Sequence, residues 1–108
     1  MEIVDKLIVS GNNIFHINNY GETLLHFAAR SKNSQVVERL LSLGLDVNQQ
    51  DYSGWTPLMR AVRDSRKEAI EILLEYGSDI TIKNNKGKIA LNYCQNDEIR
   101  NLLTHNIS

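Results

Sequence analysis

The apolar residues of this chain fall into short stripes with helical spacing. In one of them, positions i, i+1, i+4 and i+5 are occupied by Val36, Val37, Leu40 and Leu41, which places all four on one side of a helix. Gly44 follows and would end that helix in a left-handed conformation. Similar stripes lie over residues 3–8, 70–74 and 99–103. The pattern predicts a series of short amphipathic helices, none with an apolar face wide enough to be stable alone.

The stripes belong to a longer repeat, because the shift that brings Gly21 onto Gly54 superimposes ten identical residues without a gap. The identical residues of the first copy are Gly21, Thr23, Leu25, Ala28, Arg30, Glu38, Leu40, Leu41, Gly44 and Asp46. A fixed period of this length indicates a repeat array. We therefore predict one domain over residues 1–108, with an N-terminal capping half unit at 1–17, repeats at 18–50 and 51–83, and a truncated C-terminal capping repeat at 84–108.

Each complete unit is expected to start with a polar turn and a capped helix. Asn18 and Gly21 bound a turn signal, and Thr23 can cap a helix over about residues 24–31. Pro57 stands at the first helical position of the next unit, where its missing N–H does no harm. In the third unit Ile89 replaces the threonine, so we expect that cap to be lost. The segment between the two helices of this unit is also about four residues shorter.

Composition and charge exclude several classes of function. The chain has 108 residues, of which 42% are hydrophobic and 23% charged, as is typical of a folded soluble protein. A net charge of −1 gives no drive toward nucleic acid or an anionic membrane. No apolar stretch approaches the roughly 20 residues of a transmembrane helix, and the acidic start does not resemble a signal peptide. We therefore expect a cytoplasmic protein, with a nuclear location as the open alternative, and no nucleic-acid or membrane partner.

The recurring motifs carry a family resemblance. The stretches GETLLHFAA from Gly21 and GWTPLMRAV from Gly54 resemble the ankyrin-repeat pattern G-x-T-P-L-H-x-A-A, and GLDVN and GSDIT resemble its G-x-D-V-N close. The resemblance covers essentially the whole chain. It implies an all-α solenoid of stacked helix-turn-helix units with projecting β-turn fingers, and protein binding instead of catalysis. Leu24 in place of the proline, and Met59 and Asn92 in place of the histidine, depart from the pattern and should weaken the capping network.

The residues that invite a catalytic interpretation fit structural roles better. The resemblance implies that His26 hydrogen-bonds Thr23 and nearby backbone, and no nucleophile or carboxylate stands at the fixed spacing from it that acid–base work requires. Cys94 aligns with the small positions Ala28 and Ala61, which favours a buried structural thiol over a reactive one. No Cys/His cluster or glycine-rich stretch has the spacing of a metal site or a phosphate loop. We expect no enzyme activity, no cofactor and no metal.

The remaining candidates also have structural interpretations. His16 and His105 are expected to be solvated, and Asn48, which resembles an ankyrin asparagine modified by cellular hydroxylases, is expected to brace the next turn. The glutamates expected on a solvated helix face are Glu68, Glu71 and Glu75. The leucines expected to be most costly to truncate are Leu40, Leu73, Leu74 and Leu102.

Side chains that folding does not explain gather on the predicted fingertips and inner helices, where partners of this family bind. The assigned partner-binding residues are Tyr20, Glu22, Arg30, Tyr52, Trp55, Arg60, Arg63, Lys86 and Lys88. Trp55 is the strongest candidate for a partner-binding residue, because exposed Trp, Tyr and Arg are enriched at interface hot spots. The alternative is that Trp55 packs on its own finger or over the aliphatic part of Arg63. The basic members would make this face positive, so the partner should offer an acidic surface with room for an aromatic ring.

The leading functional hypothesis is a stand-alone protein, monomeric before binding, that blocks or sequesters one protein partner. An inhibitor, an antitoxin or immunity protein, an adaptor or an effector would fit. The alternative is a structural assembly unit that self-associates through its terminal helices. An enzyme is a third hypothesis, which lacks a converging set of catalytic groups.

Overall fold

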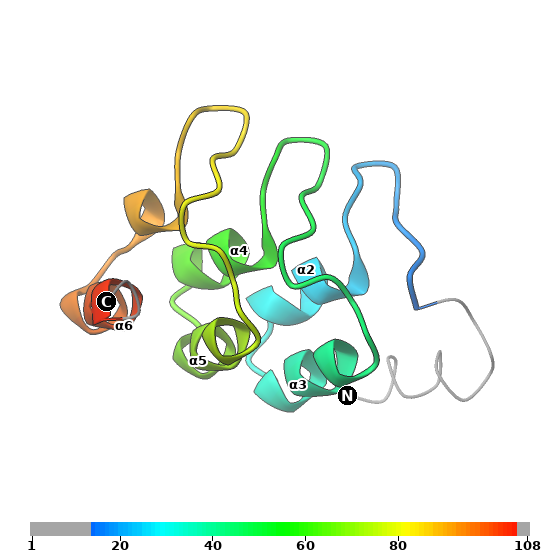
Figure 1. Cartoon of the computed structure of the whole chain (residues 1–108), viewed down its shortest axis with the longest axis horizontal. Coiled ribbons are helices and arrows are strands. Elements are labelled where there is room, and N and C mark those ends of the chain that lie inside the picture. Colours follow the sequence, from blue (N-terminus) through cyan, green and yellow to red (C-terminus); the bar gives the residue numbers. More distant parts are fainter. Residues whose placement is uncertain (1–13, 106–108) are drawn as a thin grey trace.

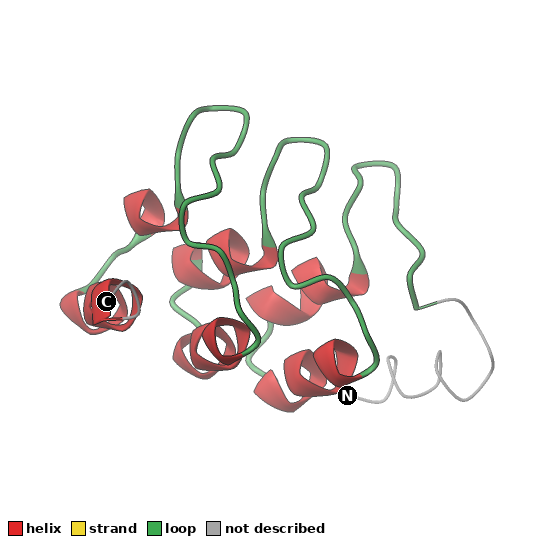
Figure 2. Ribbon diagram, viewed as in Figure 1, coloured by secondary structure: helices red, strands yellow, loops and turns green. Residues whose placement is uncertain are grey.

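The molecule is a stack of helix pairs from which three loops project to the same side (Figures 1 and 2). The computed structural model describes residues 14–105. Its elements are α2 (Leu24–Arg30), α3 (Ser34–Ser42), α4 (Pro57–Arg63), α5 (Lys67–Glu75), the 3-10 helix η1 (Ala90–Tyr93) and α6 (Asp97–His105). The described part contains helices and loops without a strand. The predicted all-α stack with projecting fingers is therefore confirmed.

The helices form two layers along the stack. In the inner layer α2 packs against α4 and α4 against η1, and in the outer layer α3 packs against α5 and α5 against α6. Helices that lie one repeat apart in the sequence therefore become neighbours in space, and each unit covers the apolar face of the next. The predicted N-terminal half unit is represented only by residues 14–17, because residues 1–13 lie outside the described part of the chain.

The inner helices begin as the sequence predicts. The Thr23 hydroxyl accepts a hydrogen bond from the His26 N–H at 3.3 Å, and the Thr56 hydroxyl accepts one from the Met59 N–H at 3.2 Å. The helix predicted over residues 24–31 ends at Arg30. In the third unit the hydroxyl cap is absent at Ile89, and the α-helix is replaced by the short 3-10 turn η1. The loss of a threonine cap thus coincides with the loss of regular helix.

The core is a continuous set of aliphatic side chains between the two layers. Leu25, Leu40, Leu58 and Leu73 are 0–1% exposed, and burying each such side chain contributes about 1.5–3 kcal/mol. The burial expected for Leu40 and Leu73 is confirmed.

The expected burial of Leu74 and Leu102 is wrong, because both are only partly buried. Leu103 is the fully buried leucine of α6, at 1% exposed. One full repeat after the start of α5 at Lys67 would be position 100, but α6 starts at Asp97, so Leu103 occupies the place of Leu73. The third unit is thus shortened by three positions and not by four. The Asn96 side chain fixes this phase by accepting a hydrogen bond from the Ile99 N–H at 2.9 Å.

The expectation of a buried Cys94 is also wrong. Its side chain is half-buried, and its thiol donates a hydrogen bond to the Asn96 carbonyl at 3.0 Å. The aligned positions Ala28 and Ala61 lie inside α2 and α4, whereas η1 ends at Tyr93. Position 94 therefore leaves the inner layer and turns toward α6.

Candidate partner-binding surface

A side-chain brace holds the base of each finger. The Asn18 amide oxygen accepts hydrogen bonds from the N–H groups of Tyr20 at 2.9 Å and Glu22 at 3.0 Å. The carboxylate of Asp51 and the amide oxygen of Asn84 do the same for the second and third fingers. These Asx turns act together with one backbone hydrogen bond across each finger, in which the N–H groups of Asn18, Asp51 and Asn84 donate to the carbonyls of Glu22, Trp55 and Lys88. This brace was not predicted from the sequence as a set, although its Asn, Asp and Asn recur at the spacing of the repeat.

Neighbouring fingers are also joined to each other at their tips. The Tyr52 N–H donates to the Tyr20 carbonyl at 2.9 Å, and the Asn85 N–H donates to the Ser53 carbonyl at 3.0 Å. The Asn85 side chain adds a hydrogen bond to the Tyr52 carbonyl at 2.9 Å. The three tips therefore form one connected ridge. Because these hydrogen bonds already restrict the backbone of the tips, binding a partner should cost little additional conformational entropy there.

The tips carry the most exposed aromatic side chains of the described residues. Tyr20 is 73% exposed and Tyr52 is 66% exposed. On the third finger Lys86 and Lys88 are exposed. Glu22 differs, because its side chain is only 11% exposed and accepts a hydrogen bond from the Asn18 amide. The two tyrosines and the two lysines thus point away from the fold, and Glu22 lies within it.

The expectation that Trp55 is an exposed anchor is wrong. The residue is only 9% exposed, and its ring lies against the ring of Tyr93 in the next unit, with centroids 4.5 Å apart. The guanidinium carbon of Arg60 lies 4.5 Å from the indole centroid, and that of Arg63 lies 5.1 Å from it. The alternative interpretation is right that Trp55 is packed and not free, but the contacts differ from those expected: the guanidinium of Arg63, instead of its aliphatic part, lies over the ring, and Tyr93 belongs to the next unit. Trp55 joins the second and third units instead of offering a free surface.

Arg60 is also committed to the fold. Its guanidinium forms an ion pair with Asp51 at 2.7 Å and approaches Glu22 at 3.6 Å, and its side chain is 13% exposed. Its buried Nε has no hydrogen-bond partner. The guanidinium instead makes a cation–π contact with the face of the Trp55 indole ring. Because two carboxylates compensate this charge, Arg60 contributes little to the expected positive face.

Arg30 and Arg63 remain on the inner-helix face. The guanidinium carbon of Arg30 lies 5.0 Å from the ring centroid of Phe27, which is itself 42% exposed. The side chain of Arg63 is 41% exposed, and its Nε lies 3.5 Å from the Asp64 carboxylate. Phe27 was not predicted as a surface residue, although it takes the place of Arg60 one repeat earlier.

His26 has the structural role that the resemblance implied. It is fully buried, and its Nδ1 accepts a hydrogen bond from the Thr23 N–H at 3.0 Å. Its Nε2 therefore carries the proton and donates to the Trp55 carbonyl at 2.8 Å. Burial lowers the pKa of His26 below its ordinary value, and the hydrogen bond to Trp55 opposes that shift only in part. A neutral imidazole thus ties the first unit to the second.

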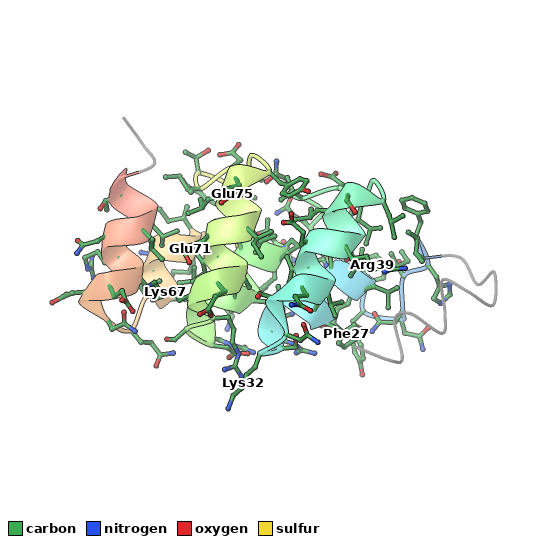
Figure 3. The ribbon with its side chains drawn as sticks, turned by 90° about the horizontal axis from the view of Figure 1, so that it is seen from below. Phe27, Lys32, Arg39, Lys67, Glu71 and Glu75 are labelled. Carbon is green, nitrogen blue, oxygen red and sulfur yellow. The ribbon has the colours of Figure 1, made fainter. Side chains whose placement is uncertain are left out.

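The outer helices form the opposite side of the molecule. Glu68, Glu71 and Glu75 are exposed as expected, and Figure 3 shows Glu71 and Glu75 along α5, with Phe27 and Lys32 at the lower edge of the view. Lys67 pairs with Glu98 at 3.1 Å, and this hydrogen bond raises the pKa of Lys67.

Two further expectations from the sequence concern side chains outside the fingers. The Asn48 amide oxygen accepts a hydrogen bond from the Asp79 N–H at 2.8 Å, which confirms that it braces the next turn. His16 is exposed, and the side chain of His105 lies outside the described part.

Residues 14–105 contain neither a metal-binding cluster nor a membrane-spanning helix. No group of three His, Cys, Asp or Glu side chains in this range is placed to hold a metal ion. No helix in this range has both the length and the apolar character that crossing a membrane requires.

The comparisons with known proteins agree with the geometry. A family model described as ankyrin repeats in three copies matches residues 1–84, which include the N-terminal stretch that the structure does not describe. No curated protein matches the chain.

Proposed function

Because the chain belongs to the ankyrin-repeat family, whose members generally mediate protein–protein interaction, we propose that it binds one protein partner through its fingertips and inner-helix face. The observation that carries this proposal is the pair of exposed tyrosines, Tyr20 and Tyr52, on adjacent tips. Tyrosine supplies a large contact area with few rotatable bonds, and it is enriched at interface hot spots. Neither ring is needed to fill the core.

The rigidity of the ridge supports the same surface. The backbone of Tyr52 is bonded to that of Tyr20, and the Tyr52 ring lies over Gly21, where an added Cβ would meet it at 2.5 Å. The backbone of both tyrosines and the ring of Tyr52 are therefore held in place before a partner arrives, which lowers the entropic cost of binding.

Charge indicates what kind of surface the partner offers. Lys86 and Lys88 lie on the third finger, and Arg30 and Arg63 lie on the inner helices. With Arg60 neutralised by Asp51, the remaining cations still favour an acidic partner. Because Trp55 is buried, the partner does not need a pocket for its indole ring.

The proposed activity is to occupy a partner's surface and thereby block or sequester it, as an inhibitor, an immunity or antitoxin protein, or an adaptor would. Three fingers and the inner layer can supply the roughly 800 Å² per partner of a standard interface. No catalytic step is part of this proposal.

The test compares tyrosines on the fingertips with a tyrosine elsewhere on the surface. The immobilised chain should capture a partner from a lysate of its own host, and Tyr20→Ser with Tyr52→Ser should abolish capture. The matched control is Tyr76→Ser, which removes a tyrosine that is 40% exposed at the end of α5. All proteins should keep the same circular dichroism melt. Equal capture by the double variant and by the wild type would place the binding surface elsewhere.

Self-association is the second candidate, favoured by one observation. Where the second unit meets the last one there is a pocket of about 120 Å³, which is lined by Ile80, Thr81, Ile89, Leu91, Leu103 and Thr104. Light scattering of the free chain separates the two proposals, because partner binding predicts a monomer. A dimer or larger assembly at micromolar concentration would favour the assembly unit.

A further inference from the structure

The three fingers share one internal geometry. The residue that opens each turn, Asn18, Asp51 or Asn84, donates its backbone N–H to the carbonyl four positions later and accepts hydrogen bonds from the N–H groups two, three and four positions later. The glycine three positions after it has a φ of +76°, +83° or +74°. Because the turns have the same conformation, carbonyl groups at equivalent positions point in the same direction along the stack.

The carbonyls on one side of each finger accept hydrogen bonds from the next finger. The Tyr20 carbonyl accepts one from the Tyr52 N–H at 2.9 Å, and at the equivalent place the Ser53 carbonyl accepts one from the Asn85 N–H at 3.0 Å. The third finger stands at the end of this row (Figure 1). Its Lys86 carbonyl is the next in the series and accepts no hydrogen bond from residues 14–105. This carbonyl therefore points away from the stack and is free to accept a further N–H.

At the base of the same finger an apolar surface is left uncovered. Leu91 is only partly buried, whereas its counterpart Leu58 is 1% exposed, because α4 packs against η1 and η1 is the last helix of the inner layer in the described part. An apolar cavity of about 150 Å³ binds benzene, so a pocket of about 120 Å³ can receive one aliphatic side chain. The pocket at this place is lined by Ile80, Thr81, Ile89, Leu91, Leu103 and Thr104.

The third finger also differs in charge from the finger before it. Lys86 and Lys88 are both exposed and form no ion pair within residues 14–105, and their counterparts on the second finger are Ser53 and Trp55. Two uncompensated lysines favour carboxylates on whatever lies against this finger. The free carbonyl needs an N–H donor, which a polypeptide backbone supplies and an ionised carboxylate does not.

We propose that the outer edge of the third finger receives an extended acidic segment of the protein partner. A backbone N–H of the segment donates to the Lys86 carbonyl and continues the series of hydrogen bonds that joins the fingers. Carboxylates lie beside Lys86 and Lys88, and one aliphatic side chain fills the pocket. The pocket matters because a peptide N–H that replaces water gains little by itself, whereas burial of an aliphatic side chain contributes more. This inference rests on the proposed function and names the kind of segment that the partner contributes.

The probe is a ten-residue peptide that alternates glutamate and threonine and carries one leucine in the middle. Threonine favours an extended backbone, and the repeating sequence lets the leucine reach the pocket in whichever register fits. The matched peptide has serine in place of the leucine. In a titration followed by NMR spectroscopy, the leucine peptide should bind about tenfold more tightly, because burial of the leucine side chain contributes about that factor.

The amide signals of the chain locate the bound peptide. The Gly87 N–H belongs to the same peptide group as the Lys86 carbonyl, so its signal should move when that carbonyl accepts a hydrogen bond. Gly54 is the internal control, because the Ser53 carbonyl before it is already bonded to Asn85. The Gly54 signal should therefore stay in place.

Substitutions separate the pocket from the charge. Ile89→Thr introduces the residue that caps the inner helices of the first two units, so it should not unfold the turn, and it should remove most of the preference for leucine. Lys86→Gln with Lys88→Gln should weaken both peptides about tenfold, at about threefold for each exposed pair. Lys32→Gln is the matched control: it removes an exposed cation between α2 and α3 (Figure 3), and it should leave the affinity within about twofold.

Five results would overturn the inference. Three of them are no measurable binding, equal affinity for the two peptides, and an unmoved Gly87 signal in the saturated complex. The fourth is a Gly87 signal that moves with protein concentration before peptide is added, since a second copy would then occupy the edge. The fifth is tighter binding of the leucine peptide to Ile107→Ser, since the chain's own last residues would then fill the pocket.

The outcome for the proposed function can be separated from these results. If one of them occurs while the tyrosine double variant still fails to capture the partner, the proposed function stands and only the docking of the acidic segment fails. If one of them occurs and the double variant captures as well as the wild type, both proposals fail.

Discussion

Replacement of Trp55 by alanine should destabilise the whole stack. The residue is 9% exposed and contacts Tyr93 as well as two guanidinium groups. A tryptophan buries about 150–250 Å², which at about 25 cal/mol per Å² corresponds to about 4–6 kcal/mol. That figure is an upper bound, since the denatured chain already buries part of the ring. We therefore expect a loss of about 3–5 kcal/mol, within the usual range for truncating a buried tryptophan.

The assay is urea denaturation followed by far-ultraviolet circular dichroism, because the substitution removes the only tryptophan and with it the fluorescence signal. For a small protein this loss lowers the urea midpoint by more than about 1 M. Trp55→Phe keeps a ring against Tyr93 and should cost less, about 1–3 kcal/mol. Tyr52→Ala removes a ring of similar size that is 66% exposed and should cost under about 1 kcal/mol.

A different result would refute the reasoning from burial. If Trp55→Ala costs no more than Tyr52→Ala, the indole does not join the second and third units. Trp55 would then be a surface residue, and its loss should act on partner capture instead. A large cost for Trp55→Ala beside an unchanged midpoint for Tyr52→Ala supports the division between a structural tryptophan and free tyrosines.

Three further changes test the core, the buried histidine and the fingers. Leu73→Ala should cost about 2–5 kcal/mol in a urea melt, because the side chain is fully buried; a loss below about 1 kcal/mol would contradict its placement. His26 has a pKa below its ordinary 6.5, so the unfolded chain binds more protons and stability should fall as the pH drops below about 6.5. His26→Gln should remove that part of the pH dependence. If the free energy of unfolding of the variant varies between about pH 7.5 and 5.5 as that of the wild type does, His26 is not the source of the dependence. Gly54→Ala should lower the free energy of unfolding more than Gly87→Ala does. Both glycines have positive φ, but only at Gly54 would an added Cβ lie 2.8 Å from the backbone of Asn85. Equal losses in the urea melt would show that the fingers are not closely packed.

The local features of each unit could be predicted because they depend on residues close in the sequence. Thr23 and His26 stand within one helical turn of each other and cap α2 as expected. The replacement of threonine by Ile89 correctly indicated an eroded third unit. The expectation that Leu102 is among the most costly leucines is wrong because α6 starts at Asp97, after Asn96 has accepted the hydrogen bond of the Ile99 N–H, and this start puts Leu103 in the buried position.

The candidate surface could be predicted only in part. Tyr20, Tyr52, Lys86 and Lys88 are exposed at the tips because a turn leaves its central side chains in water. Trp55 directly follows the same turn, yet it is covered by a ring of the third unit. Nothing within the finger itself distinguishes it from an exposed residue.

The sequence by itself determined the repeat, the pairing of helices within each unit and the turns, because periodicity and caps act over a few residues. Only the tertiary structure decided which polar and aromatic side chains remain free. Arg60 and Arg63 lie over the same indole, but only Arg60 has a buried carboxylate within 2.7 Å. Burial and ion pairing at such positions depend on the neighbouring unit, whose side chains come from a different stretch of the chain.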